Sequence, residues 1–155
     1  MIKLHNVTKI FNQTKVVDDI SVDFEQGKTN LIIGRSGSGK TVLLKSIIGL
    51  FEIDNGKIVY EDVVFSELDT SSKKKIRSQI GMLFQGAALF DSLSVEENVM
   101  FPLIMYTNQS FEENRDRVNF CLKRVNLENV NHLNPGELSG GMKKRVAIAR
   151  AIALN

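Results

Sequence analysis

The chain of 155 residues has the length of one ordinary domain. Hydrophobic residues make up 43% and charged residues 25%, as in a globular protein. The most apolar stretch, 99–106, is far shorter than the ~20 residues of a membrane-spanning helix. The formal net charge of +2 does not indicate a nucleic acid as a partner. The single cysteine, Cys121, cannot form an internal disulfide and suits a reducing compartment.

Strand patterns dominate the first half of the chain. Apolar runs and alternations predict strands at 2–7, 16–24, 31–33, 57–60 and 80–84. Asn12-Gln13-Thr14 suits the first turn, and Asn55-Gly56 marks a turn before the strand at 57–60. The segments 31–33 and 80–84 have the composition of buried strands. Residues 41–50 are apolar nearly all round and predict a central, buried helix.

Helix signals dominate the second half. In two capping boxes a serine is followed three residues later by a glutamate, so helices are expected to begin at Ser94 and Ser110. Pro135-Gly136 interrupts the chain, and a last helix is expected from Ser139 through Ala151. Strands and helices mixed in this way predict an α/β fold.

A glycine-rich segment after the predicted strand 31–33 matches the pattern G-x-x-x-x-G-K-S/T. Glycines let backbone N–H groups turn inward around a phosphate, and the following helix adds the partial positive charge of its N-terminus. Lys40 would bind the β and γ phosphates, and the Thr41 hydroxyl would bind Mg²⁺. The alternative is a glycine-rich turn with no ligand. The expected phosphate-binding residues are Gly34, Ser36, Gly37, Ser38, Gly39, Lys40, Thr41 and Val42.

A second motif distinguishes between the families that share this loop. No D-x-x-G or N-K-x-D pattern is present, which disfavours a GTPase. Leu138-Ser139-Gly140-Gly141-Met142 resembles the signature of ATP-binding-cassette (ABC) proteins. The resemblance implies a head-to-tail dimer in which Ser139, Gly140 and Gly141 of one copy contact the ATP held by the other. Without the upstream loop, the motif would be an ordinary capped surface helix.

The same resemblance assigns further residues. Gln85 matches the glutamine that helps bind Mg²⁺ and the attacking water, and Phe11 stands where an aromatic side chain stacks on adenine. Val16 would touch the ribose or the edge of the base. Two positions depart from the family pattern: Val42 lacks a second hydroxyl, and Met142 replaces a glutamine.

A narrower resemblance covers residues 81–103. M-L-F-Q-x-x-A-L-F followed by N-V-x-F-P-L is similar to the ATPases of Mla-type lipid transporters, which work with Mce-type lipid-binding proteins. The resemblance implies a membrane permease as partner and a position at the inner face of a bacterial cytoplasmic membrane. The apolar residues of this segment would form the permease groove or ordinary core.

The resemblance implies a P-loop ATPase domain with an N-terminal antiparallel region, a RecA-like core at about 1–85 and a helical subdomain at about 86–150. In this family an apolar strand ending in aspartate, a catalytic glutamate and a switch histidine follow the signature helix. None is identifiable here, so the core is expected to be incomplete and these residues are not expected to hydrolyse ATP alone. The alternatives are a soluble ABC protein unrelated to transport and a nucleotide-binding module that does not hydrolyse ATP.

Overall fold

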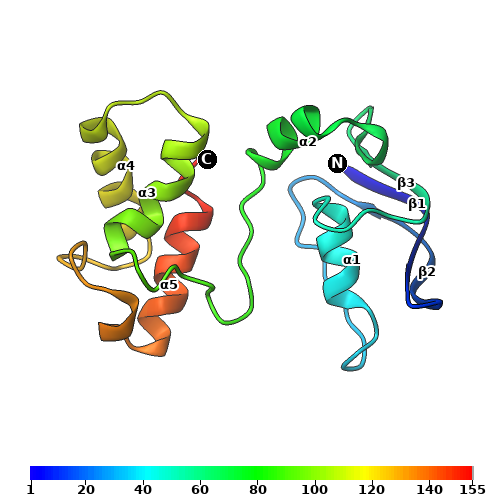
Figure 1. The fold of residues 1–155 in the computed structure, drawn as a ribbon, viewed down its shortest axis with the longest axis horizontal. Helices are drawn as coiled ribbons and strands as arrows, with labels where there is room; N and C mark the ends of the chain where they lie inside the picture. Colours follow the sequence, from blue (N-terminus) through cyan, green and yellow to red (C-terminus); the bar gives the residue numbers. More distant parts are fainter. Residues whose placement is uncertain (155) are drawn as a thin grey trace. The chain divides into compact units, whose positions relative to one another are not determined.

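The computed structural model describes residues 1–154, which divide into two units between Arg77 and Ser78. The strands assigned in this part of the chain all belong to the first unit, whereas the second is helical (Figure 1). No helix within the described residues is both long and apolar enough to span a bilayer.

The first unit is built on an antiparallel sheet in the order β2-β1-β3-β4. The strands are β1 (Ile2–Phe11), β2 (Thr14–Phe24), β3 (Asn55–Tyr60) and β4 (Val63–Val64). Asn12 and Gln13 join β1 to β2 with φ of 45° and 65°, the left-handed backbone that a two-residue hairpin turn requires. The expected hairpin and the strand at 57–60 are confirmed. The turn expected at Asn55-Gly56 was wrong, because both residues already belong to β3, where Asn55 pairs with Thr8 of β1.

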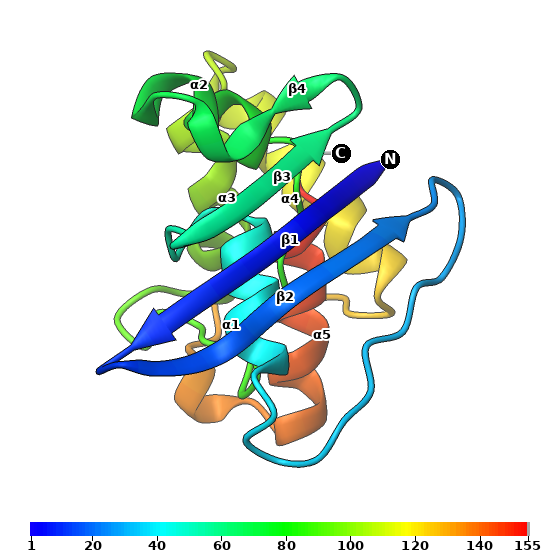
Figure 2. The same cartoon turned by 90° about the vertical axis from the view of Figure 1, so that its right-hand side faces the viewer.

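Helix α1 (Lys40–Ile47) lies against one face of this sheet (Figure 2). Leu43 and Ile47 point into the core, whereas Leu44 is 46% exposed. The expectation of a helix buried all round was wrong, because the sheet covers only one side of α1. The helix ends early, at Ile47, and the φ of 71° at Gly49 allows Leu50 N–H to bond the Lys45 carbonyl at 2.8 Å. The core consists of Leu4, Val7, Val17, Leu43, Ile47, Ile58 and Phe65.

Two expected strands do not form. Residues 31–33 and 80–84 have no strand assignment, and Leu31 and Ile33 are 81% and 80% exposed. Leu83 is 51% exposed, so the prediction that both segments are buried was also wrong. A buried strand needs neighbours that bond its N–H and C=O groups, and within residues 1–154 no strand pairs with either segment.

Short elements complete the first unit. They are the 3-10 turn η1 (Phe65–Glu67) and helix α2 (Thr70–Arg77), which has no buried residue. The sequence analysis missed α2 because the helix lacks an apolar face. A local signal was present, since Asp69 accepts hydrogen bonds from Ser72 N–H at 3.0 Å and from the Ser72 hydroxyl at 2.8 Å.

Three helices form the second unit: α3 (Val95–Tyr106), α4 (Phe111–Arg124) and α5 (Gly140–Ala151), with the 3-10 turn η2 (Pro135–Glu137) before α5. Both capping boxes are confirmed. Ser94 N–H donates to the Glu97 carboxylate at 2.7 Å, and Ser110 N–H donates to Glu113 at 2.8 Å. The completely buried side chains between these helices include Val95, Val99, Val118, Cys121 and Val146.

Candidate nucleotide-binding site

The glycine-rich segment forms a tight curl in front of α1. Gly37 and Gly39 have φ of 78° and 86°, values that a residue with a side chain rarely adopts. Lys40 reaches back into the curl, where its Nζ donates to the carbonyl oxygens of Gly34 at 2.8 Å and Arg35 at 2.7 Å. A positive charge therefore lies inside the loop without a carboxylate partner among the described ion pairs.

The loop is fixed to the sheet at Gly39. A Cβ added to Gly39 would lie 2.3 Å from the backbone oxygen of Val16, so only glycine permits this approach. Val16 on β2 therefore lies beside the loop. The first helical bond of α1 is Leu43 N–H to the Gly39 carbonyl at 2.8 Å, and no side chain caps the helix. The N–H groups of its first turn are left for an anion.

These features fit a phosphate group, because an ammonium and uncapped helix N–H groups converge on one loop. Thr41, the second helical residue, is exposed and can offer its hydroxyl to a magnesium ion. Within residues 1–154, no three His, Cys, Asp or Glu side chains are grouped closely enough to hold a metal. Magnesium would therefore need the phosphates themselves, with Thr41 as a protein ligand.

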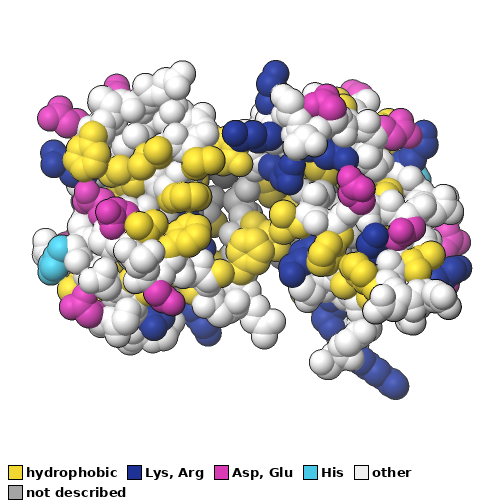
Figure 3. Space-filling model, in the orientation of Figure 1, with side chains coloured by type: hydrophobic (Ala, Val, Ile, Leu, Met, Phe, Trp, Pro, Cys, Tyr) yellow, Lys and Arg dark blue, Asp and Glu magenta, His cyan; other side chains and the backbone are white. Residues whose placement is uncertain are grey.

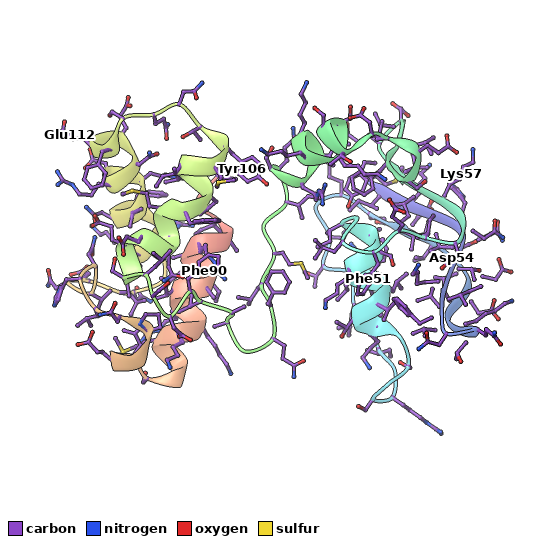
Figure 4. The ribbon with its side chains drawn as sticks, in the orientation of Figure 1. Phe51, Asp54, Lys57, Phe90, Tyr106 and Glu112 are labelled. Carbon is purple, nitrogen blue, oxygen red and sulfur yellow. The ribbon has the colours of Figure 1, made fainter. Side chains whose placement is uncertain are left out.

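Phe11 lies at the end of β1, next to the hairpin turn, and is 38% exposed. Its ring makes an edge contact with Phe51 at 5.3 Å between centroids and an angle of 77° (Phe51 is labelled in Figure 4). The Lys9 ammonium lies 5.1 Å from the Phe11 centroid. Sequence reasoning missed both neighbours. Phe51 reaches Phe11 only through the fold, whereas Lys9 had a local signal, since it lies two residues earlier on the same face of β1. Adenine stacking by Phe11 stays a prediction.

Gln85 belongs to the second unit and is exposed. It is the second residue of a turn in which Ala87 N–H bonds the Phe84 carbonyl at 3.1 Å, and Gly86 follows with a φ of 81°. The expected strand before Gln85 is absent, and the turn leaves the Gln85 side chain exposed at the surface. Its role toward magnesium stays a prediction.

The signature residues begin α5, as expected. The Ser139 hydroxyl caps the helix by accepting a hydrogen bond from Met142 N–H at 3.3 Å. Ser139, Gly140 and Gly141 are exposed, and apart from the adjacent residues and the backbone of α5 itself, no atom of the described chain lies within 4 Å of where a Gly140 Cβ would stand. Packing within the chain therefore does not require glycine at position 140.

Sequence reasoning missed Asn98 and Arg150. Asn98 is completely buried in α3, and Arg150 in the last turn of α5 bonds the carbonyls of Ala87 and Ala88. The available signal was an asparagine in the middle of an apolar helix, since a buried amide requires hydrogen-bond partners.

Comparison with known proteins gives the family of this chain. A family model described as ABC transporter matches residues 17–155. The methionine import ATP-binding protein MetN of Clostridium tetani is 41% identical over 99% of this chain and 48% of its own length. A probable ribonucleotide transport ATP-binding protein, mkl of Mycobacterium leprae, is 37% identical over 99% of this chain and 44% of its own length.

Solved structures agree as well. A dimeric post-hydrolysis state of the ATP-binding cassette MJ0796, bound to ADP and Pi, has a TM-score of 0.91 and 37% identity, and covers 100% of this chain and 70% of its own. The chain spans about half the length of the curated relatives that it matches. The glycine loop, the signature helix and the family match lead to one conclusion: this chain belongs to the ABC transporter family, as an ATP-binding domain.

Proposed function

We propose that this chain binds MgATP through the loop before α1 and couples it to transport as the ATP-binding subunit of a membrane transporter. The observation that carries the proposal is the position of Lys40, whose ammonium bonds two loop carbonyls at 2.8 and 2.7 Å in front of an uncapped helix. Phosphate oxygens would replace these carbonyls as partners of the ammonium, because a charged acceptor forms the stronger hydrogen bond.

Each residue of the site has a distinct role in this proposal. The loop N–H groups and Lys40 hold the phosphates, and the Thr41 hydroxyl and the Gln85 amide oxygen hold magnesium. Phe11 stacks on adenine, and Val16 contacts the ribose. MgATP supplies the phosphoanhydride bond whose hydrolysis drives transport. In the full transporter ATPase, Lys40 stabilises charge on the phosphates and Gln85 orients water.

A second copy of the chain is the proposed partner at α5. The exposed N-terminus of α5 and the open space at Gly140 suit close approach by a phosphate group from outside the chain. MJ0796, which is 37% identical, is dimeric and bound to ADP and Pi. In our proposal Ser139, Gly140 and Gly141 contact the ATP that the other copy holds.

A permease is the proposed partner at α3. This helix exposes Phe101, Ile104, Met105 and Tyr106 by 40% to 63%, and apolar side chains gather on the face of the second unit shown in Figure 3. An exposed apolar patch of this kind marks an interaction site. Binding there would place the subunit at the inner face of the cytoplasmic membrane.

The transported substrate is the least constrained part of the proposal. The similarity of residues 81–103 to Mla-type ATPases supports a lipid and an Mce-type partner, whereas the relatives above are named for methionine import and ribonucleotide transport. Purification of the native complex separates these substrates: an Mce-type protein would support lipid, and a small-molecule-binding protein would support the others.

Titration calorimetry with MgATP tests the binding site. We expect Lys40→Ala to weaken binding by at least about 100-fold, because it removes the ammonium that bonds the Gly34 and Arg35 carbonyls inside the loop. Lys45→Ala is the matched control: Lys45 lies on the same helix but faces the Phe51 ring, 5.4 Å from its centroid. Equal affinity in the Lys40→Ala protein would contradict the proposal.

Nucleotide turnover by the native complex distinguishes the second candidate, a nucleotide-binding module without hydrolysis. Turnover that requires Lys40 and the permease supports the transporter. Binding without turnover supports the module.

A further inference from the structure

The segment that follows Gln85 has an unusual backbone. Gly86, Ala87 and Ala88 have φ of 81°, 69° and 47°, three consecutive residues in the left-handed region. Alanine enters this region at a cost, since its Cβ approaches the following carbonyl. Backbone of this kind persists only where the surrounding structure holds it.

Arg150 stabilises this backbone by hydrogen bonds to its carbonyl groups. Its Nη2 donates to the Ala88 carbonyl at 2.8 Å and to the Ala87 carbonyl at 3.0 Å. Its Cζ lies 5.5 Å from the centre of the Phe90 ring, which Figure 4 labels beside α5. Burial lowers the pKa of the guanidinium, so this charge has lost part of its water and depends on these carbonyls.

Asn98 holds the next part of the segment. Its Oδ1 accepts from Phe90 N–H at 2.8 Å and from Arg150 Nη1 at 3.4 Å, and its Nδ2 donates to the Phe90 carbonyl at 3.0 Å. Asn98 is completely buried, so these bonds are shielded from water.

The other side of Gln85 also meets the end of α5. A Cβ on Gly81 would lie 2.3 Å from the Ala151 carbonyl oxygen, so the backbone there packs directly on the last helical turn. Gln85 thus lies between two segments that both contact the end of α5. Gly81 packs on Ala151, and Ala87 and Ala88 bond Arg150. Helix α5 therefore carries the signature residues at its N-terminus and contacts the residues on both sides of Gln85 at its C-terminus.

We propose that Arg150 is a positioning residue for Gln85: by holding Ala87 and Ala88 on the last turn of α5, it makes the Gln85 turn and the signature helix move as one body. The inference rests on the proposed MgATP function. It implies that contact of ATP with Ser139 at one end of α5 is transmitted to Gln85 at the other.

Two variants of the full chain test the holding step by amide hydrogen exchange. Arg150→Lys keeps the charge but not the planar fork, and Arg150→Met removes both. We expect exchange of the Ala87 and Phe90 amides to rise by about tenfold in Arg150→Lys and further in Arg150→Met, with α3 and α4 still protected. Arg145→Lys is the matched control, because Arg145 also lies on α5 but its Nη1 donates to the Asn126 carbonyl, at 2.9 Å.

The magnesium dependence of ATP binding tests the positioning step. The affinity for ATP with and without Mg²⁺ is measured for the unmodified chain, both Arg150 variants and Gln85→Ala. We expect Arg150→Lys to lose several-fold of the Mg²⁺ advantage, as Gln85→Ala does, with unchanged affinity for ATP alone. A purely structural role would not change this ratio.

The remaining outcomes overturn the inference. Unchanged exchange at Ala87 and Phe90 means that Arg150 does not hold the segment. Faster exchange with an unchanged Mg²⁺ advantage means that Arg150 braces the loop without positioning Gln85. Failure of the unmodified chain to bind ATP would overturn the proposed function itself and, with it, the role of Gln85, a result that is distinct from the other two.

Discussion

The helical core of the second unit and the segment 31–33 of the first differ in how completely they bury their apolar side chains. In the second unit, α3, α4 and α5 enclose Val95, Val99, Val118 and Val146 with no exposed surface. In the first unit, Leu31 and Ile33 stay about four-fifths exposed, at 81% and 80%. A helix satisfies its backbone within its own segment, whereas a strand needs partners that are distant in sequence. An apolar helix can therefore pack on its neighbours as a self-contained element, whereas an apolar segment without a paired strand stays exposed.

Truncation of one leucine in each unit should give the largest contrast. Leu103→Ala should lower the free energy of unfolding by about 2–5 kcal/mol, because Leu103 is 2% exposed within the helical core. Leu31→Ala should change it by less than about 0.5 kcal/mol, as at an exposed position. Urea unfolding of the chain measures both, and similar losses would contradict the comparison.

Glycine substitutions compare the starts of α1 and α5. Gly39→Ala should destabilise the loop by at least about 1–2 kcal/mol, because it combines a left-handed backbone with a clash at the Val16 carbonyl. Gly140→Ala should stabilise the chain by up to about 1 kcal/mol, since the space is open and alanine favours helix. Thermal unfolding of both variants checks the sign of each change in stability. A destabilised Gly140→Ala chain would contradict the open space at this position.

The serine caps should have a smaller effect. Ser94→Ala should cost about 1 kcal/mol, because the hydroxyl accepts from Glu97 N–H at 3.2 Å and alanine cannot. Ser94→Thr is the conservative control, since it keeps an oxygen at the cap. A chemical unfolding series followed by helix circular dichroism measures the difference, and equal loss in both variants would exclude capping as the cause.

The same caps should make the second unit sensitive to acid. The hydrogen bond from Ser94 N–H lowers the pKa of the Glu97 carboxyl below its ordinary value of 4.5, and Ser110 N–H does the same for Glu113. This stability is fully present above pH 4.5 and is lost as pH falls through the lower folded-state pKa. Unfolding midpoints between about pH 6 and 3 should depend less on pH after Glu97→Gln and Glu113→Gln. An unchanged profile would contradict this cause.

The sequence by itself determined the features whose causes lie within a few residues. The turn at Asn12-Gln13, the caps at Ser94, Ser110 and Ser139 and the glycine loop before α1 all follow from local backbone rules. The family resemblance rested on the same short motifs. These predictions hold because the partners of each hydrogen bond are close in the chain.

Only the tertiary structure decided the features that depend on distant partners. The segments 31–33 and 80–84 have the composition of strands, but pairing decides whether a strand forms. The approach of Val16 to Gly39 and the bonds from Arg150 to carbonyls 62 and 63 residues away leave no local pattern. Such contacts form only when the fold brings remote segments together, so no short motif predicts them.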